Sequence, residues 1–73
     1  MARLANISGK AAVKAFEKAG WRAIGQVGSH VVMTKPDVRA NLSVPPTPRA
    51  SVGTLRALIR HSGMTVEEFL DLL

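Results

Sequence analysis

The chain contains no cysteine, so neither a disulfide nor a cysteine-based zinc site can support its fold. No apolar run approaches the roughly 20 residues needed to span a bilayer, and residues 1–7 lack the apolar core and cleavage site of a secretory signal peptide. The missing cysteine also suits a reducing compartment. We therefore expect a cytoplasmic protein without membrane association.

Catalytic and cofactor motifs are equally scarce. The sequence has no HExxH, no Walker loop, no paired carboxylates on one element and no histidine cluster with metal-ligand spacing. These absences set aside several enzyme classes, and we predict neither a metal site nor a cofactor.

Positive charge and apolar residues are what the chain does contain. Ten Lys and Arg against five Asp and Glu give a net charge of +5, and 47% of the 73 residues are hydrophobic. This length suffices for a single domain, residues 1–73, of marginal stability, because such a chain buries only about 60% of its unfolded surface. A dense positive field attracts nucleic acid or an acidic protein. The alternative is a charge that only keeps the surface solvated.

The spacing of apolar residues predicts one helix followed by three strands. A helical period between Ser8 and Gly20 predicts a helix over 8–19. Two β-favouring runs, 21–27 and 30–35, flank Gly28-Ser29 and predict a hairpin. A turn over 36–39 and alternating residues over 40–44 predict a third strand.

The sequence predicts a loop followed by two helices in the second half of the chain. Three prolines exclude regular structure from residues 45–51. Leu55, Leu58 and Ile59 share a helical face before Gly63, and Thr65 with Glu68 forms a capping box that begins a last helix. The apolar stripe of that helix must dock on something; it comprises Val66, Phe69, Leu70 and Leu73. The order α-β-β-β-α, with an additional short C-terminal helix, predicts an α+β domain whose helices cover one face of a three-stranded antiparallel sheet.

His30 is the first candidate for chemistry. It begins a strand directly after the Gly28-Ser29 turn, and if Val31 and Met33 face the core, strand alternation places His30 on the open face. Imidazole exchanges a proton near neutral pH, which contributes about 10²- to 10⁴-fold in rate when it acts as an acid or base. A lone surface histidine without a role is nevertheless the commoner case.

Lysine and arginine residues on and beside the predicted strands could bind a phosphate near His30. One histidine with positive charge is enough for RNA cleavage, because RNA carries its own nucleophile, the 2′-hydroxyl, and cations stabilise the charged phosphorane. Phe16 and Trp21 are more typical of a core, and His61 of a helix C-terminus. The candidate substrate-binding residues are Lys10, Arg22, Ser29, Lys35, Arg39 and Arg49.

The order of short motifs resembles the HicA toxin family over Ser8 to Leu73. The matching series is SGK, a hydrophobic helix, GW, GSH followed by VVM, SVP, GTLRALIR and GMTVEEFLDLL. The resemblance implies a double-stranded-RNA-binding-domain-like fold and metal-independent cleavage of mRNA. It also implies neutralisation by a HicB-type antitoxin, and it is compatible with a higher-order toxin–antitoxin assembly. The catalytic histidine of the family's GSH motif corresponds to His30.

One departure concerns the third strand. Many members of the family carry a histidine shortly after its Val-Pro, where this chain has Pro46-Thr47-Pro48. We therefore expect either that His30 acts largely alone, with water or a cation assisting the leaving 5′-oxygen, or that this chain cleaves more slowly than its relatives. A non-catalytic RNA-binding module is the alternative function, and a docking surface for an acidic antitoxin that covers His30 is compatible with either.

Overall fold

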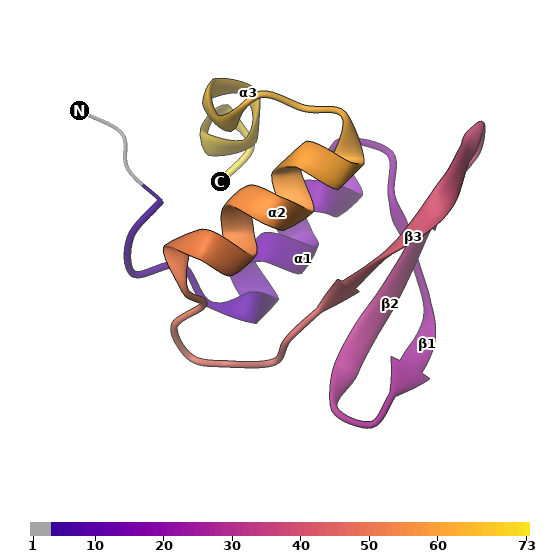
Figure 1. The fold of residues 1–73 in the computed structure, drawn as a ribbon, viewed down its shortest axis with the longest axis horizontal. Helices are drawn as coiled ribbons and strands as arrows, with labels where there is room; N and C mark the ends of the chain where they lie inside the picture. The colour runs from indigo at the N-terminus through magenta and orange to yellow at the C-terminus, as the bar shows by residue number, and fades with distance from the viewer. Residues whose placement is uncertain (1–3) are drawn as a thin grey trace.

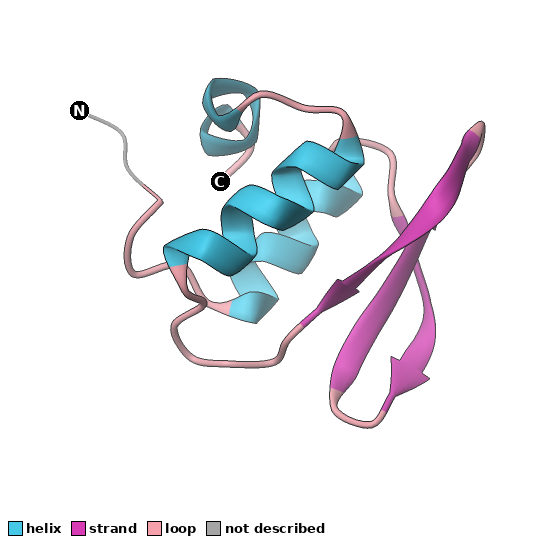
Figure 2. Ribbon diagram, in the orientation of Figure 1, coloured by secondary structure: helices cyan, strands magenta, loops and turns pink. Residues whose placement is uncertain are grey.

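The chain folds into two layers, with helices packed on one side of a three-stranded sheet (Figures 1 and 2). The computed structural model describes residues 4–73. Its elements are, in chain order, α1 (Gly9–Lys18), β1 (Arg22–Val27), β2 (His30–Lys35), β3 (Val38–Val44), α2 (Val52–Ser62) and α3 (Val66–Asp71). The strands form an antiparallel meander in the order β1-β2-β3. The predicted α+β, double-stranded-RNA-binding-like arrangement is confirmed.

The β2–β3 turn is shorter than predicted. Only Pro36 and Asp37 lie in the turn, while Val38 and Arg39 already belong to β3, so the predicted turn over 36–39 was too long. The ring of Pro36 fixes its own φ, and Asp37 adopts a φ of 70°, which a type II turn needs at its third position. Two residues therefore suffice to reverse the chain.

The end of α1 sets the centre of the core. Gly20 donates its backbone N–H to the Glu17 carbonyl, and Trp21 donates to the Phe16 carbonyl, each at 3.0 Å. This Schellman pattern requires the positive φ of 102° at Gly20. It places the Trp21 ring edge-on to Phe16, with centroids 6.5 Å apart. Both rings are buried, so their predicted role in the core is confirmed.

The helices cover the sheet unevenly. Met33, Leu42 and Val44 of β2 and β3 are buried beneath them, whereas all six residues of β1 are exposed. Large apolar side chains on β1, Ile24 and Val27, are accordingly open to solvent. The hairpin therefore projects beyond the helical layer (Figure 1).

The last helix docks mainly through Phe69, with Leu70 and Leu72 half-buried against the core. Thr65 and Glu68 form the predicted capping box, and Phe69 packs its ring 5.1 Å from Phe16. Val66 and Leu73 remain 37% and 48% exposed, so the expected docking of the apolar stripe is confirmed for Phe69 and Leu70 and not for its other two residues. A helix of six residues makes fewer than two turns and presents only a narrow face to the core. No helix of residues 4–73 has the length and apolar character to cross a membrane.

Candidate active site

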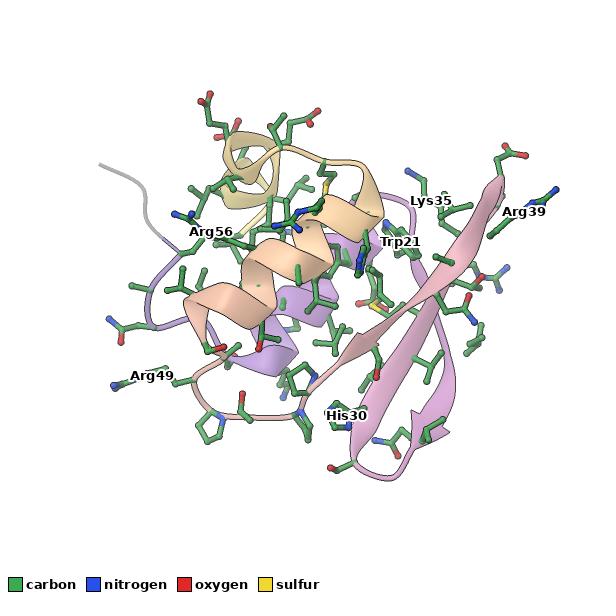
Figure 3. All side chains as sticks on the ribbon, in the orientation of Figure 1. Trp21, His30, Lys35, Arg39, Arg49 and Arg56 are labelled. Atoms are coloured by element: carbon green, nitrogen blue, oxygen red, sulfur yellow. The ribbon has the colours of Figure 1, made fainter. Side chains whose placement is uncertain are left out.

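His30 is the first residue of β2 and follows a two-residue turn. Gly28 begins that turn with a φ of 62°, a conformation that favours glycine. The next residue, Ser29, is exposed in the turn, and His30 pairs with Val27 of β1. The imidazole is exposed at this end of the sheet (Figure 3). A ligand can therefore reach both the ring and the adjacent turn.

The proline-rich segment after β3 lies beside the same end of the sheet. Val31 pairs with Val44, so one further step along the register places His30 opposite Pro45. The sheet pairing ends there because Pro45 and Pro46 lack a backbone N–H. The chain then leaves the sheet and runs toward α2.

A backbone contact fixes this segment to the start of α1. Gly9 donates its N–H to the Thr47 carbonyl at 2.9 Å, and a Cβ at position 9 would overlap the Pro45 carbonyl oxygen. A second bond joins the Ala50 N–H to the Ile7 carbonyl at 2.8 Å. Glycine at position 9 is therefore needed for close approach of two backbones. The contact carries the first turn of α1 to the His30 end of the sheet.

An open groove of about 530 Å³ lies between these three pieces of chain. Its polar groups come from Ser8, Lys10 and Thr47, while valine and proline side chains make most of the remaining wall. His30 does not line the groove, but its neighbour Val31 does. The lining residues are Ser8, Gly9, Lys10, Val13, Val31, Val44, Pro45, Pro46, Thr47 and Pro48.

The electrostatics of this end favour anions. Helix α1 is capped by Ser8, whose side chain accepts from the Ala11 N–H at 3.0 Å, and α2 is capped by Ser51. Neither helix has an acidic residue in its first turn, so no carboxylate offsets the partial positive charge of these N-termini. In α3 two glutamates occupy the first turn. The helices that begin near the proline-rich segment are thus the ones left positive.

The candidate cations separate into two groups. Lys10 lines the groove beside His30, and Arg49 lies on the same lower edge of the molecule, nearer to α2 (Figure 3). Lys35 lies five residues from His30 along β2, or about 16 Å at the rise of a strand. Arg39 lies beyond the following turn at that far end.

Arg22 belongs with the far group, because it pairs with Thr34 at the start of β1. The structure therefore places Ser29 next to His30 and Lys10 in the groove at the same end of the sheet, whereas Arg22, Lys35 and Arg39 lie at the opposite end and Arg49 lies toward α2. His61 is exposed in the last turn of α2, away from the groove residues.

Sequence reasoning missed the groove itself. Its walls come from residues 8–13, 31 and 44–48, which only the folded chain brings together. The two signals that mark it are the glycine immediately after the Ser8 cap and the prolines immediately after Val44. Among residues 4–73, no three histidine, cysteine, aspartate or glutamate side chains gather in a way that would hold a metal ion.

Comparison with known proteins agrees with this architecture. The family model described as HicA toxin of bacterial toxin-antitoxin matches residues 9–64, which is most of the chain. No curated protein matches. The matched segment runs from the glycine at the start of α1 to the residue after the turn that ends α2, and it includes every residue of the groove except Ser8.

Proposed function

Since the chain belongs to the HicA toxin family, we propose that it is a metal-independent endoribonuclease that cleaves mRNA through His30. Membership in the family makes it a toxin with an antitoxin partner. The observation that carries the enzymatic proposal is the exposed imidazole of His30 at the end of the sheet where α1, Lys10 and the proline-rich segment meet. A phosphate held there would lie beside a proton acceptor and a cation.

The proposed chemistry uses the nucleophile of the substrate. His30 accepts the proton of a 2′-hydroxyl, whose oxygen attacks the neighbouring phosphorus and forms a new P–O bond. The bond from phosphorus to the 5′-oxygen then breaks, which leaves a cyclic phosphate on one product and a 5′-hydroxyl on the other. The 5′-oxygen takes its proton from water or from the His30 imidazolium. Lys10 stabilises the negative charge of the phosphorane.

The experiment compares His30→Ala with His61→Ala, since His61 is the other histidine of the chain and is likewise exposed. Purified protein is incubated with single-stranded RNA in the presence of EDTA. We expect His30→Ala to lower the cleavage rate by about 10²- to 10⁴-fold and His61→Ala to leave it unchanged. Equal rates for His30→Ala and the wild type would exclude the catalytic role. Salt-dependent binding of RNA that stays intact would identify a binding module instead.

Inhibition is proposed to occur by occlusion. A HicB-type antitoxin that covers the exposed His30 ring in the cytoplasm would exclude RNA without altering the fold, and the net charge of +5 favours an acidic partner. In NMR spectra, the ring resonances of His30 should shift when the antitoxin binds and covers the ring. An inhibited complex in which His30 stays accessible to solvent would contradict occlusion.

A further inference from the structure

We propose that the groove between α1 and the proline-rich segment is a subsite for one unstacked nucleobase of a single-stranded RNA, the base flanking the phosphate that lies at His30. This inference rests on the proposed function and extends it to substrate selection. The groove is distinct from the catalytic side chain, because His30 does not line it. The two are nevertheless joined by one peptide unit, since Val31 lies in the groove wall and is the next residue after His30.

The chemistry of the wall suits a planar base. Val13 and Val31 offer half-buried apolar surface from α1 and β2, the rings of Pro45 and Pro46 complete it, and the buried Val44 lies behind them. Flat apolar surfaces hold extruded bases against their faces, and polar groups at the edge bond the base or its sugar. Here those polar groups are Lys10 and the hydroxyls of Ser8 and Thr47. At about 530 Å³ the groove is also within the range of roughly 300–1,000 Å³ for small-ligand sites.

Charge selects RNA over other occupants. Among residues 4–73, no carboxylate lines the groove and Lys10 is the one charged residue in its wall. The adjoining N-terminus of α1 has no acidic residue in its first turn. A nucleotide combines an apolar base with an anionic phosphate, so it complements an apolar wall edged by positive charge. A free apolar ligand would leave Lys10 unused.

The position of the groove sets which nucleotide it takes. Consecutive strand residues direct their side chains to opposite faces, so Val31 points to the helical side and His30 away from it. Because both stand at the very end of β2, a flexible strand can bend around the end of the sheet and present its phosphate to His30 and its base to the groove. A duplex cannot do this, since its bases stay stacked inside. The proposal therefore predicts cleavage confined to unpaired RNA.

The first test observes the groove by NMR without relying on cleavage. The His30→Ala variant, labelled at valine methyl groups, is titrated with a six-nucleotide single-stranded RNA and with a copy in which one nucleotide is abasic. We expect the methyl resonances of Val13, Val31 and Val44 to shift with intact RNA and to lose that shift when the base at one position is removed. Val66, exposed on α3, serves as the internal reference and should not move. Binding of RNA with no shift at the three groove valines would overturn the subsite.

The second test measures rates. Val13 is half-buried in the groove wall, so Val13→Trp should fill the groove, and Val66→Trp is the matched control on α3. We expect the wild type and the control to lose about tenfold in rate on the abasic RNA, because the missing base no longer buries apolar surface in the groove. Val13→Trp should cleave intact RNA about tenfold more slowly than the wild type does. Its rate should be the same on intact and abasic RNA. Circular dichroism confirms that each variant is folded.

The outcomes separate the subsite from the proposed function. Cleavage by the wild type that ignores base removal would reject the subsite and leave the ribonuclease standing. Base-dependent methyl shifts without any cleavage by the wild type would reject the ribonuclease and leave the subsite. Neither cleavage nor shifts would reject both. Groove resonances that respond to the antitoxin and never to RNA would assign the groove to a protein partner and overturn the proposal.

Discussion

The two ends of the sheet carry similar charge but different architecture. At one end, the β1–β2 turn presents His30 next to a groove whose walls are held by backbone contacts to α1. At the other, Lys35 and Arg39 flank the β2–β3 turn, and the turn projects away from the helices (Figures 1 and 3). A cation alone can attract a phosphate to either end. The His30 end combines an exposed imidazole with a walled groove. Under the proposed function, charge would therefore bring RNA to the molecule and local geometry would select where it reacts.

The largest effect should come from breaking the contact that builds the His30 end. Gly9→Ala places a Cβ on the Pro45 carbonyl oxygen, so the loop or the helix must move. Overpacking of this kind costs about 1–3 kcal/mol. We expect a lower free energy of unfolding in urea and a loss of RNA cleavage, because Lys10 and the groove move away from His30.

Gly53→Ala is the matched control for that change. Gly53 also lies in the first turn of a helix, α2, but a Cβ there meets nothing within 4 Å. Alanine should therefore stabilise the helix by about 0.5–1 kcal/mol. If both alanine variants behave alike, the backbone contact at Gly9 does not hold the site together.

The second largest effect should separate the two groups of cations. Lys10→Ala with Arg49→Ala removes positive charge from the groove and from the α2 side of the proline-rich segment, and Lys35→Ala with Arg39→Ala removes the same charge from the far end of the sheet. We expect the first pair to weaken single-stranded RNA binding on the order of tenfold, since exposed charge contacts contribute up to about 1 kcal/mol each. The second pair should change it much less.

Salt titrations sharpen this result. Each lost phosphate contact lowers the slope of log K against log salt by about 0.7 for a single strand. We expect a decrease near 1.4 for Lys10 with Arg49 and almost none for Lys35 with Arg39. Equal slopes for the two double variants would mean that RNA crosses the whole sheet, and the distinction between the ends would fail.

The sequence predicted the local features of the fold because each has a local cause. The cap at Ser8, the Schellman end at Gly20 and the capping box at Thr65 depend on residues within one or two turns. The hairpin turn at Gly28 is equally local. These features fix the order and type of the elements, so the double-stranded-RNA-binding-like architecture followed from them.

The candidate site was predicted less completely because its parts are distant in sequence. His30 was found through its turn and its family motif, but the residues near it depend on the register of β2 with β3 and on the contact between Gly9 and the loop. Arg22 and Lys35 begin β1 and end β2, so the hairpin predicted from the sequence already places them at the end opposite His30. The position of Lys10 could not be predicted in this way, because it depends on the contact between Gly9 and the loop.

The smallest effect should distinguish the two turns themselves. Gly28 and Asp37 both have positive φ, at 62° and 70°. Gly28→Ala forces a side chain into a conformation that costs about 1 kcal/mol or somewhat more, which corresponds to a loss of about 4–8 °C in Tm for a domain of this size. Asp37→Gly relieves a similar strain but adds backbone entropy to the unfolded chain, so stability should change by less than about 0.5 kcal/mol.

Activity should differ between these turn variants as well. Gly28 is two residues from His30, so Gly28→Ala should shift the imidazole and slow cleavage, whereas Asp37→Gly acts at the other end of β2 and should leave the rate unchanged. Thermal denaturation gives the stability of each variant, and the RNA cleavage assay is run well below both midpoints so that only folded protein is compared. A folded Asp37→Gly variant that loses activity as fully as Gly28→Ala would show that the far turn takes part in the site. In that case the reactive surface would extend along all of β2, and the difference between the two ends would be one of degree.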